Sequence, residues 1–490
     1  MLLTLDGEGP LYLQIYQALK QQILTGRLNE GEKLPASRFL ASQLAVSRNV
    51  VLLAYDQLKA EGFICGRVGA GTRVAPHLST TDTKPAALTE KSRASGGAVA
   101  KLTEQANIAL THWQARSRPW TSGTAEPTYD FRYGDVEVDP LSERIWRRLS
   151  GQALARHEFQ YGHPQGDAAL RESIAAYVNA GRGCDCTAEQ VCIVNGSQQA
   201  LDILARMFIS PGTPVMVEEP GYLGARIAFQ AAGARIVPVP VDAEGIRVAR
   251  LPQVGKVQSL IYVTPSHQFP TGSILSLPRR LALLEWAERH DSYIVEDDYD
   301  GEFRYAGRPI PALQGLDPSG RTLYVGTFSK VLFPALRLGY VILPSSLVAP
   351  FVGLRWLSDR HSATQQQQVL AAFIGEGHYE RHLRRMRKRY ETKRRILIDA
   401  LTEAFGAEIE LHGTNAGVHL LVWFKDPVLA KDESRLIESA RRAGVGIYPV
   451  SPLYQTPTKH LGLLFGYSGI SESGIVPGIA LLRQVLMKRP

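Results

Sequence analysis

The sequence predicts a chain of two folds: a small α+β unit of the winged helix-turn-helix type near the N-terminus, and a larger α/β domain with a mainly parallel sheet. Three observations support this prediction. Residues 10–75 combine helical apolar spacing with a glycine-rich pair of short strands. From about residue 129 onward, short apolar runs alternate with helical patterns. A length of 490 residues also exceeds what one hydrophobic core usually serves.

The composition is that of a soluble globular protein, with 44% hydrophobic and 21% charged residues. No apolar run reaches the roughly 18 residues of a membrane span. The first residues lack the basic and apolar pattern of a secretion signal. We therefore expect a cytoplasmic protein. A formal net charge of +8 is compatible with nucleic-acid binding, which would associate the chain with the nucleoid.

The cysteines do not form a metal-binding pattern. Cys184, Cys186 and Cys192 lie close together, but no second pair or histidine set gives zinc-ligand spacing. We expect reduced thiols and no metal site.

Three helices and two strands are expected in the first unit. Ile15, Leu19 and Ile23 repeat at helical spacing and mark the first helix. A second helix is expected from residue 35 to 44, and a third from Ser47, which can cap it, toward residue 61. Short strands are expected at 63–64 and 72–74, joined by a glycine-rich turn. This order is typical of a winged helix-turn-helix.

The third helix is the candidate DNA-recognition helix, because its N-terminal end is the part that reaches base edges. Arg48 could form two hydrogen bonds to guanine, and Asn49 could contact adenine or phosphate. Helix starts and the hairpin supply the remaining candidate contacts to DNA: Ser37, Arg38, Ser47, Arg67, Gly71 and Thr72. The alternative is a small helical domain that binds another protein.

A linker is expected over residues 76–128, because residues 76–100 are rich in Thr, Ser, Ala, Gly and Lys without apolar periodicity. Residues 102–120 within it could form a short helix. The domain at 129–490 is then expected to contain five buried strands, at 191–194, 214–217, 260–263, 293–295 and 323–325. The last hundred residues predict a smaller α/β subdomain.

A second basic segment lies at residues 381–395, with seven arginines or lysines between Arg381 and Arg395 besides those two. It fits a solvated helix face, or a patch that touches DNA beside the operator.

Two residues at strand ends point to pyridoxal phosphate as the cofactor. Lys330 follows the apolar strand 323–325, and Asp297 closes the strand 293–295. A lysine amine can bond to the cofactor aldehyde, and an aspartate can pair with the protonated pyridine nitrogen. Further candidates could bind the phosphate: Thr327, Ser329 and Arg337 after the lysine strand, and Gly196, Ser197 and Gln198 at a helix N-terminus.

Three tyrosines complete the candidate cofactor site. Tyr222 could stack on the pyridine ring, and Tyr299 could donate a hydrogen bond to its phenolic oxygen. Tyr161 is a candidate phosphate ligand that would reach in from a second subunit. Each residue alone also fits a structural role, but their joint order along the chain favours a cofactor site.

The first unit resembles the GntR-family winged helix over about 65 residues. The matching runs are Leu34-Pro35-Ala36-Ser37-Arg38 and Val46-Ser47-Arg48-Asn49-Val50. The resemblance implies that Arg38, Ser47, Arg48 and Gly71 contact double-stranded DNA.

From Tyr129 onward the chain resembles the fold-type-I aminotransferases, and within them the aminotransferase-like domain of the MocR/GabR regulators. The motifs that carry this resemblance are Ser266–Gly272, Glu296–Tyr305, Pro309–Gln314 and Gly326–Lys330. The resemblance implies a homodimer that binds pyridoxal 5'-phosphate and an operator with repeated half-sites. It implies a transcriptional regulator that senses an amine metabolite or the cofactor itself, with vitamin B6, amine or taurine metabolism as the field of control.

The sequence departs from catalytic aminotransferases at three places. Phe269 precedes Pro270 where those enzymes usually carry an asparagine, although Gln268 or His267 could replace it. The segment 461–467 lacks the arginine that holds a substrate carboxylate, and Gly224 stands where GABA-binding relatives use an arginine, with Arg226 nearby. These departures favour a sensor with weak or absent transaminase activity. A true aminotransferase with a DNA-binding appendage, and a repressor that uses the fold only to dimerise, are the alternatives.

Overall fold

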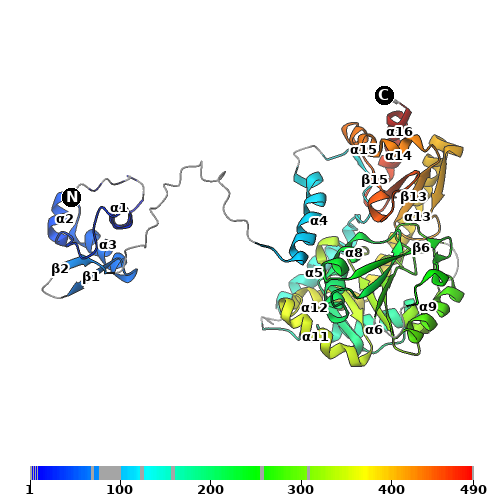
Figure 1. Cartoon of the computed structure of the whole chain (residues 1–490), viewed down its shortest axis with the longest axis horizontal. Helices are drawn as coiled ribbons and strands as arrows, with labels where there is room; N and C mark the ends of the chain where they lie inside the picture. Colours follow the sequence, from blue (N-terminus) through cyan, green and yellow to red (C-terminus); the bar gives the residue numbers. More distant parts are fainter. Residues whose placement is uncertain are drawn as a thin grey trace. The chain divides into compact units, whose positions relative to one another are not determined.

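The computed structural model describes residues 3, 5, 7, 9–67, 71–76, 101–121, 126–155, 160–253, 259–305 and 310–487. It divides the chain into two compact units, Met1–Lys101 and Leu102–Pro490 (Figure 1). No helix in these ranges is long and apolar enough to cross a membrane. Most of the expected linker lies outside the described residues, but the helix expected within it is present as α4 (Glu104–Thr121).

The first unit has the expected order of elements. Its helices are α1 (Leu11–Leu24), α2 (Ser37–Gln43) and α3 (Arg48–Ala60), and its hairpin pairs β1 (Ile64–Arg67) with β2 (Gly71–Val74) antiparallel. The side chains that predicted the helices are buried in one core: Ile15, Leu19, Leu40, Val51, Leu58 and their neighbours. Ser47 is the residue before α3, but its side chain makes no capping hydrogen bond, so this part of the prediction is wrong.

The second unit is built on one eight-stranded sheet in the order β4-β11-β10-β9-β8-β5-β6-β7. Its strands are β4 (Val191–Val194), β5 (Pro214–Glu219), β6 (Arg235–Asp242), β7 (Gly245–Ile246), β8 (Leu260–Val263), β9 (Tyr293–Asp298), β10 (Thr322–Thr327) and β11 (Gly339–Ile342). All pair parallel except β11 and β7, which run antiparallel to their neighbours. The five expected strands and the mainly parallel sheet are confirmed.

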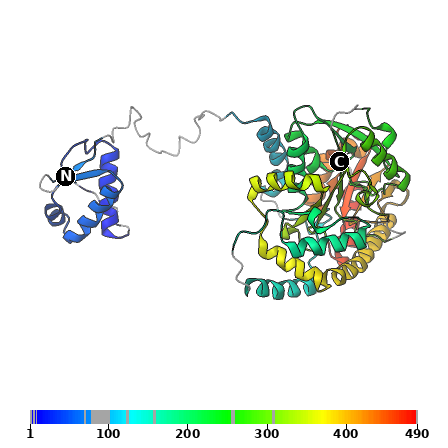
Figure 2. The ribbon, with the colours of Figure 1, turned by 90° about the horizontal axis from the view of Figure 1, so that it is seen from below.

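Helices cover both sides of this sheet (Figure 2). Alternate residues of β4 enter different cores: Val191 and Ile193 pack on one side, and Cys192 and Val194 on the other. Such burial on both faces explains why the strands are continuous apolar runs. The covering helices are α5 (Pro140–Ala155), α6 (Ala168–Arg182), α7 (Ser197–Phe208), α8 (Leu223–Ala231), α9 (Leu277–Arg289), α10 (Leu313–Leu316), α11 (Ser345–Asp359) and α12 (Thr364–Gly375).

The smaller subdomain has an antiparallel sheet in the order β12-β13-β16-β15. Its strands are β12 (Ile409–His412), β13 (His419–Phe424), β15 (Tyr448–Pro449) and β16 (Leu461–Gly466), and its helices are α13 (His378–Phe405), α14 (Val428–Lys431), α15 (Glu433–Arg442) and α16 (Glu472–Met487). Strand β3 (Tyr129–Asp130), from the start of the unit, pairs with β14 (Val445–Gly446) beside it.

The basic segment 381–395 lies on α13, and part of its charge is used inside the unit. Lys393 is buried and donates to Glu137 at 2.6 Å. Arg385 donates to Asp139 at 2.6 Å, just before α5 begins. Asp139 also accepts from the hydroxyl of Ser142 at 2.8 Å. These contacts attach α13 to α5, so the segment is neither a wholly solvated face nor a wholly free DNA-binding patch.

We predict that Asp139→Ala lowers the free energy of unfolding by about 2–4 kcal/mol, because it leaves the partly buried Arg385 without its carboxylate and removes a bond at the start of α5. Denaturant unfolding of the full chain measures this. Glu380→Ala is the matched control, since its pair with Arg384 on the same helix is exposed. That change should cost less than about 0.5 kcal/mol. Equal costs for the two variants would contradict the prediction.

The same network predicts a pH dependence. Burial alone would raise the pKa of Asp139, but hydrogen bonds from Arg385 and Ser142 outweigh it and lower the pKa to about 2. The ordinary aspartate pKa is about 4, so the stabilisation is present at neutral pH and is lost as the pH falls from about 4 to about 2. The stability difference between the wild type and Asp139→Ala should shrink in that window.

Candidate cofactor site and nucleic-acid interface

Four consecutive polar residues at the carboxyl end of β9 divide between its two faces. Glu296 and Asp298 share one face. Glu296 accepts from the backbone N–H groups of Leu313 and Gln314 at 2.8 and 3.0 Å. Asp298 accepts from Arg182 Nε at 2.6 Å and from a tyrosine hydroxyl at 2.6 Å. The strand period of two places Asp297 and Tyr299 on the other face.

Among the described residues Asp297 forms no ion pair, although the charge of Lys330 acts on it. Its Oδ2 accepts from the hydroxyl of Tyr262 at 2.7 Å. Its Oδ1 is buried and has no hydrogen-bond partner. Burial raises the pKa of Asp297 to about 7. A buried carboxylate oxygen without a partner is costly, and a protonated pyridine nitrogen is a group that would satisfy it.

Lys330 lies just after β10, the strand next to β9 in the sheet. Its Nζ donates to the backbone oxygen of Gly134 at 3.0 Å. Burial lowers the pKa of Lys330, with the carboxylate of Asp135 opposing this effect. A lysine amine that loses its proton more readily is a better nucleophile toward an aldehyde. Position 134 favours glycine, because its φ is +89° and a Cβ there would crowd Nζ.

A cradle for a phosphate surrounds the N-terminus of α7. Gly196, the residue before the helix, has φ of +83°, and a Cβ on it would lie 2.6 Å from Arg337 Nη2. Arg337 donates to Ser329 Oγ at 3.5 Å and to the Asn195 backbone at 3.2 Å. Thr327 Oγ1 accepts from the N–H of Ser329 at 3.2 Å. Free helical N–H groups, two hydroxyls and a guanidinium thus converge, as a phosphate requires.

Ser197 and Gln198 are the other predicted phosphate ligands at the start of α7. Ser197 is the first residue of α7. Gln198 donates to the backbone oxygen of Gly224 at 3.1 Å, which turns its amide toward α8. The hydroxyl of Tyr222 reaches the same glutamine at 3.4 Å.

Aromatic rings form a wall beside the site. Phe269 lies between Tyr222 and Tyr299, with ring centroids 6.1 and 6.0 Å away in edge-to-face geometry. Tyr299 also contacts His267, whose Nδ1 lies 3.0 Å from the phenolic oxygen. The structure therefore brings Tyr222 and Tyr299 to one aromatic cluster around Phe269, and their roles toward a cofactor ring stay predictions.

Gln268 and His267, the candidate replacements for the missing asparagine, both bind other protein groups. The amide nitrogen of Gln268 is buried and donates to Glu218 at 3.1 Å and to the Pro220 backbone at 2.9 Å. Burial raises the pKa of Glu218 to about 7. His267 pairs with Asp300 at 2.9 Å. Gln268 thus supports the loop, and His267 acts on Tyr299.

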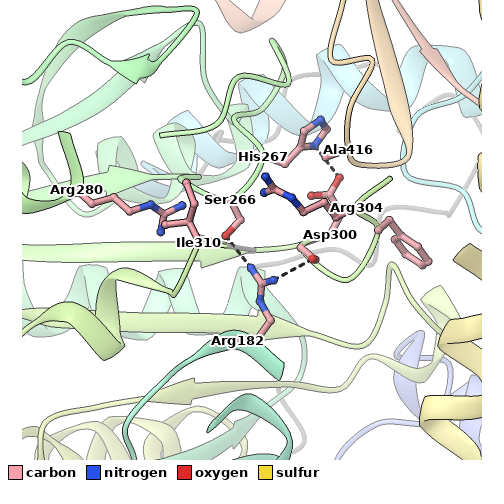
Figure 3. A pocket seen from close by; sticks show the side chains of 10 residues that line it. Arg182, Ser266, His267, Arg280, Asp300, Arg304, Ile310 and Ala416 are labelled. Carbon is pink, nitrogen blue, oxygen red and sulfur yellow. Dashed lines mark hydrogen bonds and ion pairs between the residues drawn. The ribbon is translucent and has the colours of Figure 1, made fainter. Parts of the chain in front are cut away.

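A small polar cavity of about 10 Å³ lies beside Asp300 (Figure 3). Arg182 reaches across it to Ser266 at 2.8 Å and to the backbone of Gly301 at 3.0 Å. Arg280 lines it as well. The space suits about one water molecule. Arg182 and Arg280 pair with Asp298 and Glu296 on their face of β9. Among the described residues, neither arginine donates a hydrogen bond to the unpartnered Oδ1 of Asp297.

Tyr161 is the one predicted cofactor residue that the structure places elsewhere in the chain. It is 82% exposed and contacts the ring of His361 and the guanidinium of Arg360. Arg226 is also engaged, because it donates to the backbone oxygens of Pro452 and Leu453 at 3.0 and 3.4 Å.

The first unit brings the candidate DNA contacts to neighbouring helix starts. Ser47, Arg48 and Asn49 are exposed at the start of α3. Arg48 Nε donates to Ser37 Oγ at 3.3 Å, which joins the starts of α2 and α3. Arg38 is exposed beside them.

The hairpin carries the other predicted contacts. Gly71 has φ of +79°, and a Cβ there would lie 2.7 Å from Lys33 Cε. Thr72 follows it in β2. The side chain of Arg67 lies outside the described part of the chain. Lys33, which the sequence did not single out, is therefore a basic neighbour of the wing.

Sequence reasoning missed three groups at the cofactor site. Tyr262 was interpreted only as part of an apolar strand, yet it holds Asp297. A polar aromatic hydroxyl inside a buried run was the signal that could have found it. Gly134 contributes only its backbone, which no side-chain pattern reveals. Asp300 lies within the motif Glu296–Tyr305, and no sequence pattern assigns it a separate role.

Comparisons with known proteins agree with both folds. Residues 11–74 match the family model for bacterial regulatory proteins of the gntR family, and residues 129–455 match the model for aminotransferase class I and II. The kynurenine aminotransferase of Pyrococcus horikoshii is a similar solved structure. It has a TM-score of 0.68 and 27% identity, with 82% of this chain and 98% of that chain covered.

Whole-chain relatives share both domains. The HTH-type transcriptional regulator YdeL of Bacillus subtilis is 39% identical, covering 97% of this chain and 96% of its own. The probable rhizopine catabolism regulatory protein MocR of Rhizobium meliloti is 36% identical, with 99% and 96% covered. The pyridoxine biosynthesis regulator PdxR of Corynebacterium glutamicum is 30% identical, with 94% and 92% covered. The chain therefore belongs to the MocR-type HTH transcriptional regulators, in which a gntR-family domain precedes a domain of the pyridoxal phosphate-dependent class I and II aminotransferases.

Proposed function

We propose that this regulator holds pyridoxal phosphate on Lys330 and reports the state of that site through Arg48 and its neighbours on operator DNA. The observation that carries the proposal is the buried, unpartnered Oδ1 of Asp297 on the strand next to Lys330. Oδ1 of Asp298 also lacks a partner, but Asp298 forms an ion pair with Arg182, whereas Asp297 forms no ion pair among the described residues.

Each predicted cofactor residue has a role in this proposal. Asp297 pairs with the pyridine nitrogen, and Tyr222 and Tyr299 bind its ring and phenolic oxygen. The phosphate is bound by the cradle of Gly196, Ser197, Gln198, Thr327, Ser329 and Arg337. The bound cofactor supplies an aldehyde that captures primary amines. Three features support the assignment of this cofactor. The carboxylate of Asp297 suits its protonated ring nitrogen, the lowered pKa of Lys330 suits its aldehyde, and the anion-binding groups around α7 suit its phosphate.

The effector follows from the same site. We propose an amine metabolite or the cofactor itself rather than a simple amino acid. All six residues of β16 are buried and none is an arginine, and Arg226 is tied to backbone oxygens. Among the described residues of this region, no arginine is thus offered to an effector carboxylate. The relative MocR regulates rhizopine catabolism and the relative PdxR regulates pyridoxine biosynthesis, so each supports one of these two alternatives.

A homodimer that binds repeated half-sites at the nucleoid completes the proposal. Effector binding would shift the dimer between two arrangements by its different affinity for each. Tyr161 is exposed, as a residue that reaches a partner's phosphate must be.

A catalytic aminotransferase is the second candidate, because the lowered pKa of Lys330 also suits proton transfer. Incubation with amino acids and a keto acid separates the two. Many turnovers per chain would establish the enzyme, whereas a sensor should complete at most about one.

We predict that Lys330→Ala abolishes the visible absorbance that pyridoxal phosphate acquires on the wild-type protein, because it removes the amine proposed to bond to the aldehyde. Spectra of the reconstituted protein measure this. Lys388→Ala, at an exposed lysine on α13, is the control and should keep the band. A band that survives Lys330→Ala would refute the lysine assignment.

We predict that Arg48→Ala weakens binding to the specific operator about tenfold or more, because one good contact to a base contributes about 1–3 kcal/mol. Cofactor absorbance should stay unchanged. Operator fragments come from selection against random DNA, and mobility shifts at fixed salt give the affinities. Arg27→Ala is the charge-matched control, since Arg27 is exposed away from the start of α3. Equal losses for both variants would show a non-specific charge effect.

A further inference from the structure

Three side chains form a buried polar cluster beside Asp297. His267 Nδ1 lies 2.9 Å from Asp300 Oδ2 and 3.0 Å from the hydroxyl of Tyr299. The side chains of His267 and Asp300 are each 1% exposed. One nitrogen atom therefore links a buried carboxylate to a half-buried phenol.

The chemistry of the three groups fixes where the hydrogens lie. An ionised carboxylate only accepts, so the short contact to Asp300 requires that Nδ1 of His267 carries a hydrogen. An Nδ1–H group has no lone pair to offer Tyr299. The phenolic oxygen then accepts from His267, and the hydrogen of Tyr299 is left for an acceptor, a role for which Asp300 competes with a bound group.

The surroundings hold this arrangement. A Cβ on Gly417 would lie 2.0 Å from His267 Cε1, and one on Gly272 would lie 3.0 Å from Nε2, so backbone encloses the imidazole ring. His267, Asp300 and His419 have potential ligand atoms within 4.8 Å of one another, but this enclosure of Nε2 leaves little room for an ion.

Titratable groups around the cluster favour a neutral phenol. Burial raises the pKa of Tyr299 well above its ordinary value, and the carboxylates of Asp300, Asp297 and Glu218 add to this. Burial lowers the pKa of His419 to about 3, so this neighbour stays neutral. Lys330, Arg182 and Arg304 are charged groups near the cluster. Tyr299 therefore keeps its hydrogen and stays a donor.

We propose that Asp300 and His267 are positioning residues that turn the hydroxyl hydrogen of Tyr299 toward the phenolic oxygen of the cofactor. The proposal rests on the proposed function, because it needs pyridoxal phosphate at Lys330. Asp300 acts by selecting the tautomer of His267. Without Asp300 the ring can lose its Nδ1 hydrogen, and the tyrosine then donates to the ring rather than to the cofactor.

The proposed hydrogen bond predicts the direction in which the pH midpoint of the visible band shifts when the bond is lost. A hydrogen bond donated to the phenolic oxygen lowers its negative charge, so the nitrogen that joins Lys330 to the cofactor holds its proton less tightly. Loss of that bond raises the pH midpoint at which the visible band titrates. Loss of the charge of Asp300 alone would do the opposite, because an anion near a cation stabilises it.

The experiment is a pH titration of the visible band of the cofactor-loaded full chain. We expect Tyr299→Phe, Asp300→Asn and His267→Leu each to raise the midpoint by about one pH unit, a tenfold change in proton affinity. His267→Asn retains an N–H near the position of Nδ1 and should keep the wild-type midpoint. In the Tyr299→Phe background, Asp300→Asn should not raise the midpoint further, since both changes remove the same hydrogen bond to the cofactor.

Several outcomes would overturn the proposal. A midpoint that Asp300→Asn lowers or leaves unchanged would show that the carboxylate acts by its charge or only as structure. If Asp300→Asn raised the midpoint equally in the wild type and in Tyr299→Phe, Asp300 would act on the cofactor without Tyr299. If the wild type binds no cofactor, the proposed function fails first and the positioning role fails with it. Normal loading with unshifted variants rejects the positioning role alone.

Discussion

The site depends on how the carboxylates at the end of β9 are compensated. Glu296 and Asp298 face a side that offers backbone N–H groups and the guanidinium of Arg182. Asp297 faces a side that offers one tyrosine hydroxyl. Burial of an uncompensated carboxylate is unfavourable unless a ligand supplies the missing donor. A cofactor with a protonated ring nitrogen would therefore stabilise the folded chain as well as complete the site.

Much of this arrangement could be predicted from the sequence, because it depends on local patterns. Apolar runs fixed the position of β8, β9 and β10, and a polar residue at the end of a parallel strand falls at the edge where ligands bind. Lys330 and Asp297 were found in this way. Strand β6 was missed because Pro238 and Pro240 interrupt its apolar pattern. Strand β11 was missed because it begins with Gly339, which weakens the apolar pattern of a strand.

Contacts between distant segments were beyond such patterns. Arg182 and Asp298 are 116 residues apart, and His267 and Asp300 are 33 apart, so only the folded sheet brings them together. The basic segment on α13 shows the same limit. Its composition suggested a surface for DNA, whereas the structure uses Lys393 and Arg385 to hold neighbouring elements. Composition reports the charge of a segment, but burial decides what that charge does.

The bond between Lys330 and Gly134 joins two layers of the unit. Lys330 follows a strand of the large sheet, whereas the segment that carries Gly134 continues from β3, which pairs with β14 beside the small subdomain. The backbone oxygen of Phe131 also accepts from Gly466 at the end of β16. A nitrogen that bonds to an aldehyde carbon has fewer hydrogens left for the Gly134 oxygen. In the proposed complex, occupancy of the site and the attachment of the small subdomain would therefore both depend on Lys330 Nζ.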